Sequence, residues 1–466
     1  MSGLGIDFGT TNSSAVFYDG REFVDVVGVM PTALYLDREF GASVGQDAVD
    51  AYLRENTGRL VELEAEDLGE IEFTIAGGDE IQGSKQDGGA ITHIARVHAF
   101  TDRQLPGRLF RSVKRWLGDS ALDSVRVFER RYRIVALVTP ILVHLEQQAA
   151  KAGASGSSLY VGRPVRYQGR RKDATRTAVQ RMREACGHAG LTAADLYPEP
   201  VAAAASFLHG RAREPGRIVL AFDFGGGTLD LTVVREGVVR EGRDDFEILA
   251  TCGRGIGGDA IDQALYRAFV FPELGEGATF HRPVGPDLRE FAFPFRDFSE
   301  RLLNWTLAYE LNRPDLRGVI LEAMRERGET GRRLERLWEL VTRNHAYRVF
   351  QAVERAKVRL SDEECAAIEV PEIDLRRELR RSELEQVISG LLGEIGACVD
   401  EAVARSGVPA HEIGLVARTG GSSRIPAVIR LLEERFPGRV VEHAPFSSIS
   451  AGLALAAHAR RSVPGC

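Results

Sequence analysis

Two similar stretches lie half a chain apart: LGIDFGTTNSSAVFYDG at residues 4–20 and VLAFDFGGGTLDLTVVREG at residues 219–237. Each predicts an apolar strand, the tripeptide Asp-Phe-Gly, a turn of small residues and a second strand rich in apolar and β-branched residues. A fingerprint that recurs at this spacing predicts two lobes with the same core, each contributing one β-hairpin.

The segments around these hairpins alternate between helices and strands, which is typical of α/β lobes. Periodicity predicts helices at 139–153, 173–190, 257–271 and 447–460, a buried strand at 158–165, and a strand–loop–helix unit at 415–436. Residues 301–348 predict a helical subdomain, and residues 60–89 an acidic, glycine-rich insertion with short strands. We expect one lobe to comprise residues 1–212 plus 440–466 and the other to comprise residues 213–439.

The composition narrows the function classes. The formal net charge is -7 over 466 residues, so a nucleic acid is not the expected partner. The five cysteines include no C-x-x-C pair, which argues against a zinc site or a disulfide framework and fits a reducing compartment. The first residues lack a signal-peptide pattern, and the apolar stretches are too short to span a bilayer, so we expect a cytoplasmic protein.

The turn of the first hairpin, Asp7-Phe8-Gly9-Thr10-Thr11-Asn12, carries groups that suit a phosphate. Gly9 would let the backbone approach the phosphate, and the backbone N–H groups and the hydroxyls of Thr10 and Thr11 would donate to its oxygens. The Asp7 carboxylate would be repelled there unless a divalent cation lay between, which implies Mg²⁺ held partly through water. One such turn alone is equally compatible with an ordinary hairpin.

The second turn, Asp223-Phe224-Gly225-Gly226-Gly227-Thr228, favours the phosphate hypothesis. Three consecutive glycines cost backbone entropy, and close approach of a ligand is a physical reason to retain them. Thr228 is expected to bind or orient the terminal phosphate, and Asp223 to meet the same cation from the opposite lobe. The two turns together predict phosphate binding between the lobes.

The paired hairpins are similar to the phosphate loops of the actin, sugar kinase and heat-shock ATPase superfamily, and further segments resemble the DnaK-type heat-shock protein 70 chaperones. These segments run in family order: FRSVKRWLG (110–118), PEPVAAA (198–204), GGD (257–259) with Asp262, ERAK (354–357) with Leu360-Ser361, and GGSSRIP (420–426). The resemblance implies an actin-like ATPase fold with two duplicated, ribonuclease H-like lobes around a nucleotide cleft. It also implies slow hydrolysis of ATP with Mg²⁺.

The resemblance assigns roles to individual residues. Lys114 would face the γ-phosphate and help to position the attacking water, and Glu199 would hold a water in the shell of the cation, beside Asp7 and Asp223. The remaining nucleotide-binding residues are expected to be Gly257, Gly258, Asp259, Glu354, Lys357, Ser361, Gly420, Gly421, Ser422 and Arg424. Within this set Glu354 and Lys357 would contact the ribose, and Arg424 would stack on the adenine.

Several features depart from the family pattern. Val358 stands where the family has a second arginine against the adenine, and Pro445-Phe446 stands where it has an acidic residue, so adenine preference is less secure than phosphate chemistry. The sequence ends at Cys466 without the family's leucine-rich linker and peptide-binding β-sandwich. With the insertion at 60–89 and the helical region, this resembles the short YegD-like subfamily. We therefore expect no grip on unfolded peptide.

Three functions compete on this evidence. The first is a chaperone-related ATPase, monomeric, that acts as a conformational switch with an unidentified protein partner. The second is a small-molecule kinase of the same superfamily, which would need a general base near an acceptor hydroxyl, and the sequence offers no convincing candidate. The third is an actin-like filament protein, which would need heterologous self-contacts.

Overall fold

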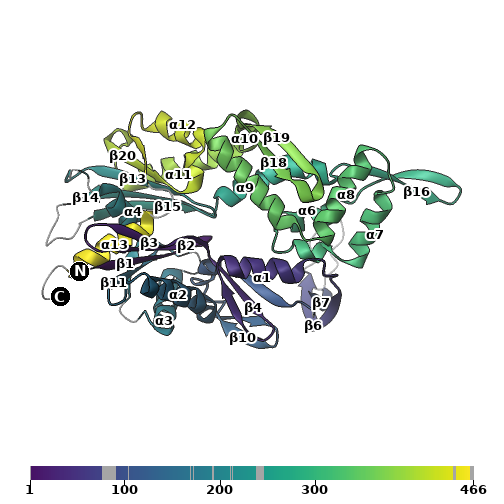
Figure 1. The fold of residues 1–466 in the computed structure, drawn as a ribbon, viewed down its shortest axis with the longest axis horizontal. Coiled ribbons are helices and arrows are strands. Elements are labelled where there is room, and N and C mark those ends of the chain that lie inside the picture. Colours follow the sequence, from purple (N-terminus) through teal and green to yellow (C-terminus); the bar gives the residue numbers. More distant parts are fainter. Residues whose placement is uncertain are drawn as a thin grey trace, which may run out of the picture.

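The computed structural model describes residues 2–75, 91–102, 104–167, 169, 171, 173–191, 194–209, 211, 214–237, 246–443 and 448–461. Two five-stranded sheets form its centre (Figure 1). The first has the order β12 (Asp195–Pro198), β11 (Ser158–Arg163), β1 (Gly3–Phe8), β2 (Asn12–Tyr18) and β3 (Phe23–Pro31). The second has the order β15 (Phe246–Arg254), β14 (Leu229–Glu236), β13 (Ile218–Phe224), β20 (Ile413–Thr419) and β21 (Val440–Glu442).

The two sheets share strand order and pairing sense. In the first, β1 pairs antiparallel with β2 and parallel with β11, and β11 pairs parallel with β12. In the second, β13 pairs antiparallel with β14 and parallel with β20, and β20 pairs parallel with β21. The repeated sequence therefore forms the same hairpin, β1–β2 and β13–β14, at the centre of each sheet.

Two helices lie between the sheets. The helix α13 (Ser448–Arg461) packs on β1, β2 and β11, and α4 (Glu199–Leu208) packs on β13 and β14 and on α13 itself (Figure 1). Glycines allow this close packing: a Cβ on Gly5 would lie 2.0 Å from the Ser450 carbonyl oxygen, and one on Gly452 would lie 1.8 Å from that of Ala202. At these points the backbone of β1 packs directly on the backbone of α13, and the backbone of α13 packs directly on that of α4.

Further helices cover the outer faces. On the first sheet and its neighbouring strands these are α1 (Gln46–Asn56), α2 (Ile134–Lys151) and α3 (Ala174–His188). The second half contains α5 (Gly258–Leu265), α10 (Arg381–Val387), α11 (Ser389–Ser406) and α12 (Pro426–Arg435). Its helical region comprises α6 (Arg296–Leu302), α7 (Pro314–Ala323), α8 (Glu329–Thr342) and α9 (Ala346–Asp362). None of the described helices is long and apolar enough to span a membrane.

Smaller sheets complete the architecture. A three-stranded sheet contains β5 (Ala42–Val44), β4 (Ala33–Asp37) and β8 (Gly107–Arg111), and β8 leads into the short 3-10 helix η1 (Val113–Trp116). Four two-stranded sheets are β6 (Leu63–Ile75) with β7 (Ile91–Asp102), β9 (Ser124–Val127) with β10 (Arg130–Arg133), β16 (Thr279–Val284) with β17 (Asp287–Ala292), and β18 (Cys365–Val370) with β19 (Leu375–Arg380).

Most predicted elements are confirmed, with differences at three places. The helix predicted at 139–153 begins earlier, at Ile134, and runs through Pro140. The insertion at 60–89 forms one long strand, β6, paired with β7, rather than short strands, and its residues 76–89 lie outside the described part. The hairpins β16–β17 and β18–β19 were not predicted. All six residues of β17 are exposed, so this strand shows no buried face in its pattern.

The packing of α13 on α4 generates a stability prediction. Gly452→Ala should lower the free energy of unfolding by about 1–3 kcal/mol, because the new Cβ meets the backbone of α4, which cannot move aside cheaply. Gly393→Ala in the second turn of α11 is the matched control: nothing lies within 4 Å of its Cβ position, so helix propensity should raise stability by about 0.5–1 kcal/mol. Chemical denaturation measures both, and a neutral Gly452→Ala would contradict the close packing.

Candidate nucleotide-binding site

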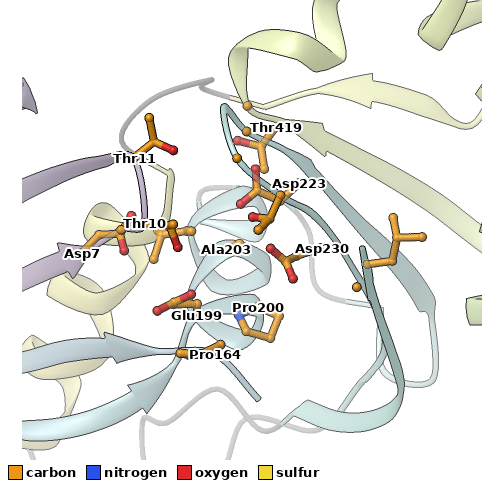
Figure 2. A pocket seen from close by; sticks show the side chains of 18 of the residues that line it. Asp7, Thr10, Thr11, Pro164, Glu199, Pro200, Ala203, Asp223, Asp230 and Thr419 are labelled. Atoms are coloured by element: carbon orange, nitrogen blue, oxygen red, sulfur yellow. The ribbon is translucent and has the colours of Figure 1, made fainter. Parts of the chain in front are cut away.

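A cavity of about 740 Å³ lies between the two central hairpins. Figure 2 shows Asp7, Thr10 and Thr11 on one side, Asp223 and Asp230 on the other, and Glu199 below them. Fourteen residues predicted for the site line the cavity: Asp7, Gly9, Thr10, Thr11, Asn12, Lys114, Glu199, Asp223, Gly225, Gly226, Gly227, Thr228, Gly420 and Gly421. The structure thus brings together the expected phosphate- and cation-binding groups from both halves of the sequence, with Gly420 and Gly421, which were expected beside the adenosine.

The turn of the first hairpin requires its glycine for its own closure. A Cβ on Gly9 would lie 2.0 Å from the carbonyl oxygen of Asn12, in the same turn. The sequence assigned Gly9 to the approach of a phosphate, but the turn alone already excludes a side chain there. Thr10 and Thr11 follow at the tip, and the Thr11 carbonyl accepts a hydrogen bond from the backbone N–H of Thr32 at 2.8 Å.

The glycines of the second turn let the two hairpin tips meet. A Cβ on Gly226 would lie 3.3 Å from Thr11 Cγ2, and one on Gly227 would lie 3.0 Å from Thr11 Oγ1. The Arg115 guanidinium donates to the Gly227 carbonyl at 3.2 Å, which links the tip to η1. Small residues are therefore needed here because the tips face each other across the cavity.

Acidic side chains converge below the tips, with one lysine among them. Asp7 and Asp223 each stand one residue before the end of their strand, and Glu199 is the first residue of α4. Lys114, on η1, is buried and donates from Nζ to Glu199 Oε1 at 2.8 Å. Burial by itself lowers the pKa of Lys114, but the Glu199 and Asp7 carboxylates outweigh burial and raise it, so the lysine is a fixed positive charge.

Negative charge on the side chains of Asp7 and Asp223 is unfavourable in the folded protein. Burial raises the pKa of Asp7 to about 7, with a further rise from Glu199 and a partial offset from Lys114. Burial raises the pKa of Asp223 to about 8, and the charges of Asp230 and Asp7 add to the rise. Without a counter-charge these carboxyls would therefore hold protons near neutral pH.

Asp230 is a site residue that the sequence analysis missed. It lies on β14 two residues after Thr228 and lines the cavity. Burial raises its pKa, although a hydrogen bond from the Thr228 side chain lowers it in part. Strand alternation predicts an ordinary solvent-facing side chain at this position of LDLTVV, so the pattern does not mark Asp230 as a cavity residue.

The other predicted nucleotide-binding residues do not line this cavity: Gly257, Gly258, Asp259, Glu354, Lys357, Ser361, Ser422 and Arg424. Three of them instead donate hydrogen bonds to backbone carbonyls in the turn of the second hairpin. The backbone N–H groups of Gly258 and Asp259 donate to the carbonyls of Gly225 and Gly226, at 2.9 and 2.6 Å. The Ser422 hydroxyl donates to the same Gly225 carbonyl at 3.3 Å.

Two of the residues predicted to contact adenosine, Lys357 and Arg424, have protein partners in the structure. Lys357 is buried and pairs with Asp262 at 2.8 Å, and Arg424 pairs with Asp362 at 3.3 Å. Glu354 is exposed, and Val358 is 52% exposed, so neither side chain is packed in the core. Pro445-Phe446, the other departure from the family pattern, lies outside the described residues. Adenosine contacts remain a prediction for this group.

Comparison with known proteins identifies the family. A family model described as Hsp70 protein matches residues 122–276 and 338–458, which is more than half of the chain. The chain belongs to the Hsp70 family. The matched segments contain the second hairpin, Glu199 and the 420–426 segment, whereas the first hairpin and Lys114 lie before them.

Proteins named Chaperone protein DnaK are among its relatives. The chain is similar to the Chaperone protein DnaK of Deinococcus proteolyticus, 26% identical over 299 residues that cover 61% of this chain and 36% of the relative. It is similar to the Chaperone protein DnaK of Thermus thermophilus, 27% identical over 329 residues, 67% of this chain and 41% of the relative. It is also similar to the Chaperone protein DnaK of Mycoplasmopsis agalactiae, 25% identical over 333 residues that cover 69% of this chain and 44% of the relative. The chain thus spans about two fifths of the length of these relatives.

The Hsp70 family uses nucleotide and Mg²⁺ generally, and the carboxylates of this cavity fit such a cation. Asp7 Oδ1 is buried and has no hydrogen-bond partner among the described residues, so it is available to a cation or to its water shell. The described residues contain no group of three or more His, Cys, Asp or Glu side chains close enough to hold a metal ion by themselves. The donor set therefore suits a cation whose remaining ligands are water and phosphate.

The charge balance of the cavity generates a pH prediction. The Asp223 pKa of about 8 in the folded state exceeds its ordinary value of 3.8, so the unfolded chain loses this proton at lower pH than the folded chain does. In chelator and without nucleotide, stability should therefore fall as pH rises from about 4 to about 8. Asp223→Asn should flatten this decline and be more stable than the parent at pH 8 by about 1–3 kcal/mol.

Denaturant titrations across this pH range provide the measurement. Asp25→Asn, at an exposed position on β3, is the matched control and should follow the parent. A variant at Asp223 that is less stable than the parent at pH 8 would show that this carboxylate is not under electrostatic strain.

Proposed function

We propose that this chain is an ATP-binding and slowly ATP-hydrolysing module of the Hsp70 family that works as a conformational switch with a protein partner. The single observation that carries the proposal is the meeting of both hairpin tips over a cavity that also holds the Lys114–Glu199 pair. A phosphate chain placed there would contact both halves of the chain at once. Hydrolysis would remove such a link, which is the physical basis of a switch.

The residues of the chain suit phosphate binding. Backbone N–H groups and hydroxyls at the tips, from Thr10, Thr11, Gly226 and Gly227, would donate to phosphate oxygens. Lys114 would offset the charge that develops on the transferred group and would orient the attacking water. Asp7, Asp223 and Glu199 would hold Mg²⁺, mostly through water, and the ion would neutralise the repulsion between carboxylates and phosphate.

The finer assignments belong to the same proposal. The chain would divide into two duplicated, ribonuclease H-like lobes: residues 1–212 with the C-terminal segment, and residues 213–439. Because β21 pairs with β20, residues 440–442 are better counted with the second lobe. Glu354, Lys357, Gly420, Gly421, Ser422 and Arg424 would serve the adenosine end, and Gly257, Gly258, Asp259 and Ser361 would complete the nucleotide site. We further propose that the protein is a monomeric, cytoplasmic member of the YegD-like subfamily.

The tips generate a binding prediction. Gly226→Val should weaken ATP binding in Mg²⁺ at least 100-fold, because its branched side chain would fill the space between the Thr11 side chain and the phosphate. Gly393→Val, at an open position on α11, should bind like the parent. Calorimetry measures both affinities, and unchanged binding by Gly226→Val would remove the phosphate from the hairpin tips.

The buried lysine generates a catalytic prediction. Lys114→Met keeps the aliphatic stem but removes the charge, and should reduce phosphate release from ATP by about 10²-fold or more while changing ATP affinity less. Lys151→Met, at the exposed end of α2, is the matched control. Single-turnover phosphate release provides the measurement, with ATP alone and with candidate metabolites. Equal turnover in Lys114→Met and parent would exclude the assigned role, and release that requires a metabolite would favour a kinase.

A further inference from the structure

Two cysteine side chains touch at one wall of the cavity, which Cys252 itself lines. Cys252 lies on β15 and Cys398 on α11, 146 residues apart in sequence, and their Sγ atoms are 3.1 Å apart. Both side chains are buried, and both are free thiols in the structure. The helix packs directly on the strand, so the contact joins two regular elements rather than two loops.

A charged pair lies over these thiols. The Glu401 carboxylate, one helical turn after Cys398, accepts a hydrogen bond from the Cys252 thiol and pairs with the Arg254 guanidinium. Burial raises the pKa of Cys398 to about 12, and its hydrogen bond to Cys252 adds to the rise. Cys398 is fully buried, whereas Cys252 is 5% exposed, beside the charged pair. The two thiols are therefore not equivalent: Cys252 is the one nearer to solvent and to a proton acceptor.

We propose that Cys252 and Cys398 form a reversible disulfide by exchange with a low-molecular-weight disulfide. The Cys252 thiol gives its proton to Glu401 or to solvent, and its sulfur attacks the small disulfide, which releases one thiol. The Cys398 sulfur then attacks Cys252 Sγ in the mixed disulfide, which releases the second thiol and its proton. Two S–H bonds are lost, one S–S bond is formed, and the small disulfide is reduced to two thiols.

The bond would act on the wall of the cavity. Residues Thr251 to Gly255, at the end of β15, line the cavity, and so does Arg405 of α11. Glu401 pairs with both Arg254 and Arg405, and Arg405 also donates to the Thr251 carbonyl at 3.4 Å. A disulfide would fix α11 to β15 at the centre of this network. This inference rests on the thiol geometry and does not require the proposed function.

The test uses the full chain under native conditions. The protein is equilibrated with oxidised and reduced glutathione, quenched, unfolded with an alkylating agent and mapped by mass spectrometry. We expect a linked pair of peptides containing Cys252 and Cys398, two hydrogens lighter than the separate peptides, which reducing agent separates. We also expect the thermal midpoint of the oxidised protein to rise by several degrees, because the bond closes a long loop.

Two variants make the result specific. Cys186→Ser, which removes a buried thiol on α3, should leave the linkage and the rise in midpoint unchanged. Cys398→Ser should abolish both, and should leave Cys252 either reduced or joined to glutathione. Full alkylation of Cys252 and Cys398 in the oxidised parent would overturn the proposal. So would a linkage of Cys252 to Cys186 or Cys365 in place of Cys398.

Discussion

The structure depends on a concentration of negative charge that the fold cannot neutralise by itself. The half-buried side chains of Asp7 and Asp223 line one cavity with Glu199 and with the more exposed Asp230, and Lys114 is the one buried lysine that pairs with this group in the described part of the chain. Burying carboxylates in this way is unfavourable unless a cation or a proton accompanies them. The raised pKa values of Asp7 and Asp223 follow from this unfavourable burial of negative charge.

The fold places this charge by packing backbone against backbone. Gly5 and Gly452 let α13 lie between β1 and α4, and α4 then carries Glu199 at its first turn to a position between the two hairpins. The glycines of the second turn, Gly226 and Gly227, bring the opposing tips into contact over the carboxylates. Small residues therefore have two uses in this chain: they hold the halves together at the centre, and they leave room for a ligand at the tips.

Much of this was predictable from the sequence, because repeated motifs and apolar periodicity report local structure directly. The two central hairpins, the helices α2, α3, α5, α12 and α13, the helical region and the residues at the two hairpin tips were predicted, whereas α1, α4, α10 and α11 were not. Asp230 was missed because strand alternation cannot tell a solvent-facing residue from one that faces a cavity. The β-branched residues Ile368 and Val370 on either side of Glu369 could have revealed β18, which was overlooked. The contacts of Lys357 with Asp262, and of Cys252 with Cys398, join distant segments and leave no pattern in a single sequence.

The most direct test of the charge account is ATP affinity with and without Mg²⁺, in the parent and in the double variant Asp7→Asn, Asp223→Asn. In the parent, Mg²⁺ should strengthen binding strongly, because the ion separates phosphate from carboxylate. In the double variant this dependence should largely vanish, and Mg²⁺-free ATP should bind more tightly than it does to the parent. Equal or weaker binding of Mg²⁺-free ATP by the double variant, with the Mg²⁺ dependence intact, would contradict the account.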